Sequence, residues 1–256
     1  MRMLGRPGVA MRALGWLVVV GLLQPLVWAV WVSFAAGEIA RPALDEWSLR
    51  WHVQLWTDAR WRGALGNSAL VALGAMTVAL SVGVPAALVQ PRWLDRLILL
   101  PLAMPPLILG VGLLPTMHLL GLHGTLLGLM LAQALLGLPL VYLATRAALA
   151  AVPAELLEAA RGLGASPWQV WSRVTLPLMA PGVAGGAALA FIVSFNDFFI
   201  SLFVAGPDAE TLPVLIWPAM RYSLSPLVAS ASLWAMALAG CGLLVGSRLF
   251  VRKMDF

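Results

Sequence analysis

The sequence predicts an all-α integral membrane protein with six transmembrane helices. Of its 256 residues, 61% are hydrophobic and 11% are charged, whereas a typical soluble domain is about 45–50% apolar and about 25% charged. The apolar residues form long runs, and a helix needs about 20 mostly apolar residues to cross a bilayer core about 30 Å thick. The single cysteine and three histidines lack disulfide or metal-binding spacing. This composition excludes a soluble enzyme, and no metal site is expected.

Six apolar runs are the predicted spans, and one transmembrane domain is expected to cover residues 1–256. The runs are about 14–34, 64–89, 97–116, 124–146, 181–205 and 227–248. Arginines precede the first run, as in a signal peptide, but the run is longer than the roughly 7–15 apolar residues of such a segment, which favours an uncleaved helix. Four prolines lie in the third run and predict a kinked helix inside the bundle.

The basic residues predict that both termini are cytoplasmic. An even number of spans places both termini on one side, and with the termini inside, the inner segments hold 11 of the 16 basic residues. These residues are Arg2, Arg6, Arg12, Arg92, Arg96, Arg146, Arg161, Arg173, Arg248, Arg252 and Lys253. Because Lys and Arg in short loops set orientation, the net charge of +5 is assigned to membrane topology, and no nucleic-acid partner is expected.

A charged segment interrupts the apolar runs at residues 150–180, which we call the cytoplasmic loop. Pro153 suits the first position of a helix, and Glu155 lies in its first turn, where the helix dipole favours negative charge. These residues predict a short helix at about 153–162. Gly164 follows where a residue with positive φ is needed to end the helix.

A second short helix is predicted after this turn. Ser166 is a suitable N-cap, and Pro167 fits the first helical position. Trp168 and Trp171 are three residues apart and share one face, which would give a rigid aromatic anchor for a partner protein. The alternative is a loop that only connects two spans.

The cytoplasmic loop also carries a spaced motif. The pattern is Glu-Ala-Ala, three residues, Gly, nine residues, an aliphatic residue, any residue and Leu-Pro. It is filled by Glu158, Ala159, Ala160, Gly164, Val174, Leu176 and Pro177. This motif resembles the signature loop of permease subunits in binding-protein-dependent ABC importers. Leu176 and Pro177 are also expected to end the second short helix before the span that begins at Pro181.

The resemblance implies a permease with the type I ABC importer fold, multi-pass in the bacterial inner membrane. The loop would bind a separate ATP-hydrolysing subunit. The implied partners are two ATP-binding subunits, a second homologous permease and an extracytoplasmic substrate-binding protein. ATP and Mg²⁺ would be bound by partner subunits and no cofactor by this chain. Its one lysine, Lys253, cannot form a phosphate-binding G-x-x-x-x-G-K-[ST] loop, so no catalytic residue is expected here.

Other stretches narrow the resemblance to a branch of the family. "LGNSALVAL" in the second run and "SFNDFFISLFVAGPDAETLPVLIW" around the fifth resemble the second permease of spermidine/putrescine importers. The resemblance implies polyamine transport. Permeases for opines, other amines, ferric iron or thiosulfate share much of this pattern and remain alternatives.

Asp197 is the candidate substrate contact. It lies inside the fifth run, where a carboxylate costs at least about 2.5–3.5 kcal/mol at the centre of a membrane helix and marks a functional hypothesis. Continuous helical spacing would place Ser194 and Ser201 on its face. Asn196 is a weaker candidate for substrate contact. A carboxylate among aromatic side chains suits an amine substrate. The alternatives are a hydrogen bond between helices, a coupling group of an ion-driven transporter, or a membrane anchor without transport.

Overall fold

The computed structural model describes residues 9–41, 46–89, 92–222 and 225–251. Four basic residues used for the predicted orientation, namely Arg2, Arg6, Arg252 and Lys253, lie outside these ranges. The described residues divide into two compact units. The smaller lies within residues 1–62 and 216–236, and the larger lies within 63–215 and 237–256.

The smaller unit is held together by polar contacts between separate helices. It contains α1 (Val9–Ser33), α2 (Arg50–Thr57), the end of α11 (Leu212–Tyr222) and the start of α12 (Pro226–Val251). The indole Nε1 of Trp51 donates a hydrogen bond to the carbonyl of Ala35 at 2.8 Å. The hydroxyl of Ser230 donates to the carbonyl of Ser33 at 3.2 Å. The end of α1 is thereby joined to both α2 and α12.

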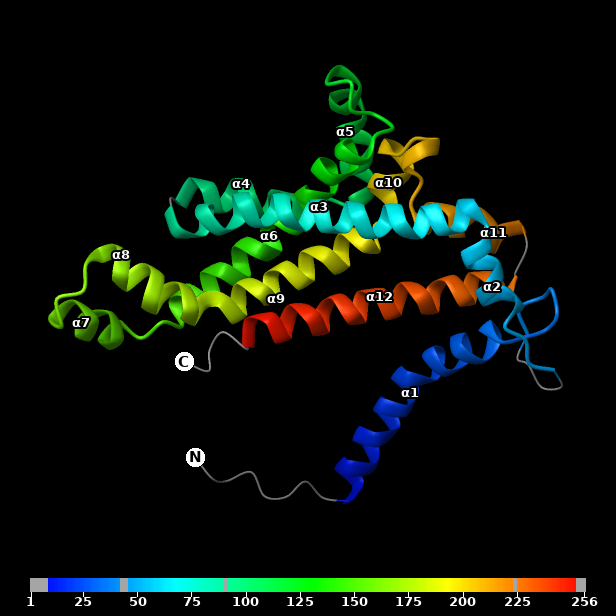
Figure 1. Cartoon of the computed structure of the whole chain (residues 1–256), viewed down its shortest axis with the longest axis horizontal. Helices are drawn as coiled ribbons and strands as arrows, with labels where there is room; N and C mark the ends of the chain where they lie inside the picture. The colour runs from blue at the N-terminus through cyan, green and yellow to red at the C-terminus, as the bar shows by residue number, and fades with distance from the viewer. Residues whose placement is uncertain (1–8, 42–45, 90–91, 223–224, 252–256) are drawn as a thin grey trace. The chain divides into compact units, whose positions relative to one another are not determined.

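The larger unit is a bundle of helices with short helices attached (Figure 1). Its helices are most of α3 (Ala59–Val89), then α4 (Arg92–Ala103), α5 (Pro106–Leu119), α6 (Leu126–Ala150), α7 (Ala154–Gly162), α8 (Pro167–Val170), α9 (Leu176–Phe195) and α10 (Phe199–Val204). The helices α6 and α9 pack along each other, as do α5 and α10.

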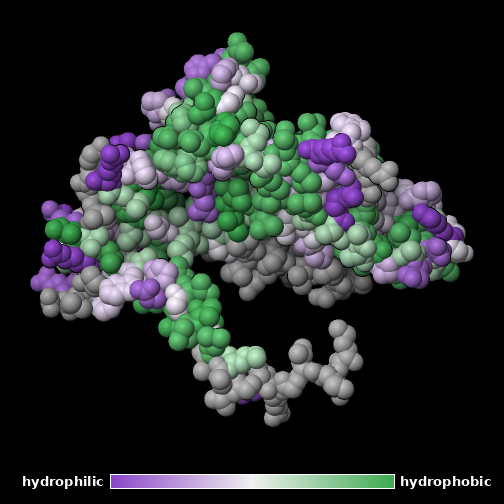
Figure 2. All heavy atoms as spheres, turned by 180° about the vertical axis from the view of Figure 1, so that it is seen from behind, coloured by the Kyte–Doolittle hydropathy of each residue, from purple (hydrophilic) through white to green (hydrophobic). Residues whose placement is uncertain are grey.

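Small residues allow α6 and α9 to approach closely. A Cβ atom added at Gly186 would lie 2.9 Å from the Cβ of Ala144, and one added at Gly137 would lie 2.8 Å from the Cβ of Ala190. Such small-residue contacts are typical of membrane helices, where close backbone packing replaces the hydrophobic drive. The outer surface is strongly apolar, and Figure 2 shows hydrophobic side chains over a large part of the face in view. Such a surface fits a lipid environment.

The structure confirms an all-helical membrane protein with four or five candidate spans. Four described helices are long and apolar enough to cross a membrane: Leu14–Ser33, Ala59–Val89, Leu126–Ala150 and Pro167–Phe195. A fifth is obtained if the bent pair Trp93–Ala103 and Pro106–Leu119 counts as one span. At the sixth predicted position, Pro226–Gly240 is a shorter apolar helix among the described residues.

The third predicted span, 97–116, is wrong as a single kinked helix. It is divided into α4 and α5, whose axes differ by 109°. Pro105 and Pro106 lie at this break. Neither can donate a backbone hydrogen bond, and Pro105 also disfavours a helical conformation for Met104 before it.

The fifth predicted span, 181–205, is also divided. The helix α9 ends at Phe195, and α10 begins at Phe199. Asp197 therefore lies between two helices rather than inside one. Its carboxylate accepts hydrogen bonds from the backbone N–H groups of Ile200 and Ser201, which is how a capping side chain starts a new helix.

The predicted end of the second loop helix at Leu176 and Pro177 is wrong too. The chain stays helical from Pro167 to Phe195, through a π-helical turn at Trp171–Thr175. The N–H of Leu176 bonds to the carbonyl of Trp171, five residues back. Because Pro177 has no N–H to donate, this widened turn accommodates it without ending the helix.

Candidate functional site

Gln133 is the centre of a buried polar cluster in the larger unit. It lies on α6 and is 1% exposed. Its Nε2 donates hydrogen bonds to Asp197 Oδ2 at 3.2 Å and to Ser201 Oγ at 2.7 Å. Its Oε1 accepts one from Ser194 Oγ at 2.5 Å. These four residues, which we call the Gln133 cluster, join α6 to the end of α9 and the start of α10.

Asp197 is held by donors from two elements. Its Oδ2 accepts from the N–H of Ser201 at 3.0 Å, and its Oδ1 accepts from the N–H of Ile200 at 3.4 Å. Together with the Gln133 amide, these contacts fix the side chain, which is 7% exposed. The contact to Oδ1 is long for a hydrogen bond, so this oxygen is the less engaged of the two.

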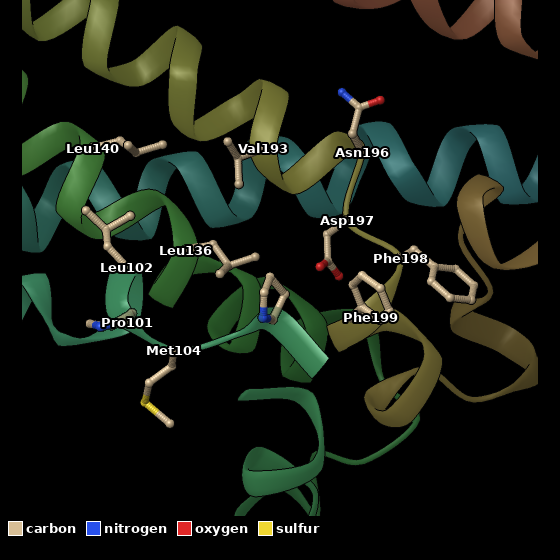
Figure 3. Close-up of a pocket in the computed structure, with 11 residues that line it drawn as sticks. Pro101, Leu102, Met104, Leu136, Leu140, Val193, Asn196, Asp197, Phe198 and Phe199 are labelled. Carbon is tan, nitrogen blue, oxygen red and sulfur yellow. The ribbon is translucent and has the colours of Figure 1, made fainter. Parts of the chain in front are cut away.

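Asp197 also lines a cavity of about 420 Å³. The lining residues are Pro101, Leu102, Met104, Pro106, Leu136, Leu140, Val193, Asn196, Asp197, Phe198 and Phe199. Figure 3 shows the Asp197 carboxylate directed toward the side of Leu136 and Phe199, with the Asn196 amide directed the opposite way. The cavity therefore combines one carboxylate with apolar and aromatic walls, as expected of a ligand pocket.

Both broken segments of the chain line this cavity. Pro101, Leu102, Met104 and Pro106 lie at or beside the break between α4 and α5, and residues 196–199 lie at or beside the break between α9 and α10. The ends of α4 and α9 and the starts of α5 and α10 therefore lie beside the cavity, and the first N–H groups of α10 are directed at the Asp197 carboxylate.

The predicted pathway residues are only partly brought together. Ser194, Asp197 and Ser201 meet in the Gln133 cluster, although no continuous helix joins them. Asn196 is not part of that cluster, because its amide donates to the carbonyl of Ile192 at 2.9 Å. Gln133 was not predicted. The sequence does mark Gln133 as unusual, because it is the one amide side chain in the apolar run 124–146. Polar groups inside membrane spans mark functional positions.

The cytoplasmic loop contains the predicted turn at Gly164. The helix α7 begins at Ala154, one residue later than expected, with Pro153 as its N-cap. Gly164 has φ of +81°, which confirms the predicted left-handed conformation. Its N–H bonds to the carbonyl of Arg161 at 2.9 Å, and the N–H of Ala165 bonds to that of Ala160 at 3.1 Å. This pair of bonds is a Schellman motif.

Ser166 begins α8 as predicted. Its hydroxyl accepts from the N–H of Gln169 at 3.4 Å, and the Gln169 side chain accepts from the N–H of Ser166 at 2.8 Å. This reciprocal capping box, together with the Schellman motif, fixes the path of the chain between α7 and α8.

The loop exposes large apolar side chains. Trp168 is 72% exposed and Leu163 is 89% exposed, whereas Trp171 is half-buried. Of the motif residues, Glu158, Ala159, Leu176 and Pro177 are exposed and Ala160 is half-buried. The helices α7 and α8 lie at one end of α6 and α9 (Figure 1). Leu163 was not predicted as part of this surface.

No metal centre accompanies these features: in the residues that the structure describes, no group of three or more His, Cys, Asp or Glu side chains could hold a metal ion.

The chain is similar to known membrane components of transport systems. A family model described as "Binding-protein-dependent transport system inner membrane component" matches residues 79–255. The chain is 32% identical over 219 residues to the putrescine transport system permease protein PotI of Escherichia coli K12, covering 80% of this chain and 78% of that protein. It is 29% identical over 213 residues to the spermidine/putrescine transport system permease protein PotC of Haemophilus influenzae, covering 80% and 82%. It is 36% identical over 176 residues to the molybdenum transport system permease protein ModB of Mycobacterium tuberculosis, covering 60% and 67%.

Solved structures show a similar fold. A bacterial ABC transporter involved in the import of the acidic polysaccharide alginate has a TM-score of 0.62 at 16% identity, covering 98% of this chain and 100% of that chain. The alginate transporter in complex with an alginate pentasaccharide-bound periplasmic protein also gives a TM-score of 0.62, at 15% identity, covering 94% and 96%. At such low identity, the likeness is one of fold.

Proposed function

The chain belongs to the family of inner membrane components of binding-protein-dependent transport systems, and from this premise we propose that it conducts polyamines across the membrane. It is a permease subunit of an ABC importer and a multi-pass inner-membrane protein. It is not an enzyme, because ABC systems hydrolyse ATP on partner subunits. Such a transporter works with a substrate-binding protein, as the alginate transporter does with its periplasmic protein.

One observation carries the choice of a cationic cargo: the Asp197 carboxylate lines the cavity between the two broken helices. A carboxylate attracts an ammonium group and repels an anion. The rings of Phe198 and Phe199 also line the cavity, and an ammonium group over such a ring gains about 0.5–2 kcal/mol. PotI and PotC, whose names include putrescine, support the same choice.

Cargo competition tests this proposal. The chain is reconstituted in vesicles with its second permease, the ATP-binding subunits and the binding protein. ATP-dependent uptake of labelled putrescine is then measured with excess unlabelled spermidine or excess molybdate. We expect spermidine to suppress the uptake and molybdate to leave it unchanged. ATP-dependent uptake of molybdate, with none of putrescine, would contradict a cationic cargo.

The same proposal includes the topology of the chain and its partner subunits. Its six helices would form a single transmembrane domain over residues 1–256, with the type I importer architecture and both termini in the cytoplasm. A second, homologous permease would form the other half of the pathway, and two subunits that bind ATP and Mg²⁺ would lie on the cytoplasmic side. The matched fold supports this arrangement.

The cytoplasmic loop is the proposed contact with an ATP-binding subunit. The exposed Trp168 and Leu163 provide the kind of large apolar anchors that dominate binding energy at protein interfaces. The Schellman motif and the capping box hold these anchors in place. When ATP closes the partner subunits, the loop would move with them and turn the bundle outward, and hydrolysis would return it inward by the sliding of packed helices.

A further inference from the structure

A second polar cluster lies outside the Gln133 cluster and joins α4 to α6. The hydroxyl of Tyr142 donates a hydrogen bond to Asp95 Oδ1. The guanidinium of Arg146 donates to the same oxygen at 3.2 Å and also contacts the Tyr142 hydroxyl at 3.2 Å. Asp95 lies in the first turn of α4, and the other two residues lie one turn apart on α6. We call these three residues the Asp95 cluster.

Apolar packing positions this cluster. Tyr142 is 1% exposed and packs with Ile98 of α4 and Ala87 of α3 in one hydrophobic cluster. The side chains of Asp95 and Arg146 are 34% and 35% exposed. A pair this exposed contributes little to stability because solvent screens it. Its geometry is nevertheless specific, because the two charges meet only at one position of α4 along α6.

The α6 end of the cluster leads directly to the cytoplasmic loop. Arg146 is four residues before the end of α6 at Ala150, and α7 follows at Ala154. A Cβ atom added at Gly182 of α9 would lie 2.5 Å from the Cβ of Ala148. Both chain segments that leave the loop are thus packed against each other, and a displacement of the loop must move them together.

The α4 end of the cluster leads to the cavity. Pro101, Leu102 and Met104, at the end of α4 and just beyond it, line the cavity opposite Asn196 and Asp197. Beyond Ala103 the chain is broken by prolines and turns through 109°. The helix α4 consequently has no continuous helical connection to α5, and its position depends on its contacts with α6 and with Ala87 of α3.

From this placement we propose that Asp95 and Arg146 are positioning residues that make α4 follow α6, so that movement of the cytoplasmic loop reshapes the cavity. The inference rests on the proposed binding of an ATP-binding subunit to the loop. The charge pair offers a direct test of this coupling, because its two charges can be removed singly or exchanged.

The experiment compares transported putrescine per hydrolysed ATP in reconstituted complexes. The variants are Asp95→Asn, Arg146→Met and the exchange Asp95→Arg with Arg146→Asp, each checked for co-purification of the ATP-binding subunits. The control is Glu38→Gln, which removes the exposed pair of Glu38 with Arg50, at 3.6 Å in the smaller unit. We expect each single variant to assemble and to hydrolyse ATP. The amount of putrescine transported per hydrolysed ATP should fall at least about fivefold, which is the lower end of typical coupling energies. The exchange should restore most of this ratio, and the control should not change it.

Three results would overturn the inference. The first is an unchanged ratio of transported putrescine to hydrolysed ATP in both single variants. The second is a loss of assembly, and the third is an equal loss of hydrolysis and transport that the exchange does not restore, since either would mean that the cluster is structural. Failure of the proposed function is seen separately, because the unsubstituted complex would then show no ATP-dependent putrescine uptake at all.

Discussion

At the scale of single residues, Asp197 performs two tasks with one carboxylate. Its backbone-directed contacts to Ile200 and Ser201 start α10, and its carboxylate lines the cavity. An asparagine can place its amide oxygen at the Oδ2 position and keep the shorter bond from Ser201, but its amide nitrogen cannot accept the bond from Ile200, and it carries no charge. The substitution therefore removes the charge and keeps the shorter of the two bonds that start α10.

Asp197→Asn should weaken putrescine uptake while the complex still assembles. Losing the charge removes an interaction that, as a hydrogen bond to a charged group, is worth about 1.5–3 kcal/mol, so KM should rise about 10- to 100-fold. The measurement is the concentration dependence of ATP-driven uptake. Asn196→Ala, whose amide bonds to the backbone within α9, is the control and should differ little from the unsubstituted chain. Unchanged kinetics in Asp197→Asn would assign the carboxylate a structural role alone.

Gln133→Leu should destabilise the chain. The leucine cannot donate to Asp197 or Ser201, and it leaves the Ser194 hydroxyl without its acceptor in a buried site. Hydrogen bonds between membrane helices contribute modestly, so the free energy of unfolding should fall by about 1–2 kcal/mol. Thermal unfolding in detergent measures this loss. An unfolding temperature equal to that of the unsubstituted chain would show that the cluster does not hold α6, α9 and α10 together.

Trp168→Ala should weaken binding of the ATP-binding subunit without changing the stability of the permease. The side chain is 72% exposed, so its removal leaves no internal cavity, whereas anchors at interfaces contribute about 2 kcal/mol or more, equivalent to about 30-fold in affinity. The readout is co-purification at graded subunit concentrations. Trp47→Ala, which is 68% exposed on a predicted outer segment, is the matched control. Equal retention by both variants would contradict binding through the loop.

At the scale of elements, turns and caps that depend on neighbouring residues could be predicted, whereas helix breaks and contacts between distant segments could not. The Gly164 turn and the Ser166 cap follow from residues a few positions apart, so the sequence was sufficient to place them. The break at Asp197 was missed because a continuous apolar run has the same hydropathy whether or not its helix is interrupted. The prolines of the third run predicted irregular backbone, but a bend of 109° exceeds the kink that was expected.

The partners of Gln133 show the same limit for the candidate site. Its position in an apolar run marks it as unusual, yet its contacts with Ser194, Asp197 and Ser201 arise from packing of α6 against α9. Those contacts depend on the small residues along both helices, and their register cannot be read from either helix alone. Asn196 shows the reverse case, since it lines the cavity next to Asp197 but its amide bonds within α9 and takes no part in the Gln133 cluster.

Gly164→Val should uncouple ATP hydrolysis from uptake. With φ of +81°, this backbone is strained for any side chain, and a β-branched residue adopts it least readily. A Cβ atom there would have no neighbour within 4 Å, so the effect comes from the backbone alone, at about 1–2 kcal/mol. The measurement is uptake per hydrolysed ATP in assembled complexes.

Gly162→Val is the matched control for this change. Gly162 also has no atom within 4 Å of an added Cβ, but it lies in the last position of α7, where valine is tolerated. We expect this variant to retain most of its coupling. If both valine variants behave alike, the turn at Gly164 has no special role.

At the scale of the whole molecule, the two breaks and the loop occupy positions that fit transport. Hydropathy predicted six spans. The described helices provide four candidates, or five if the bent pair counts as one span, and Pro226–Gly240 at the sixth position is shorter. Irregular backbone at membrane depth is tolerated where protein or a water-filled cavity covers it. That both breaks line one cavity is consistent with this rule, and the chain belongs to a transport family.

We propose that this chain conducts a cationic solute in a transporter driven by ATP. It is tested most directly in vesicles that contain the complete complex and the binding protein, with ATP or an ion gradient supplied separately. The account predicts that putrescine uptake requires ATP and persists when proton and sodium gradients are abolished. Robust uptake driven by a proton or sodium gradient in the absence of ATP would contradict it.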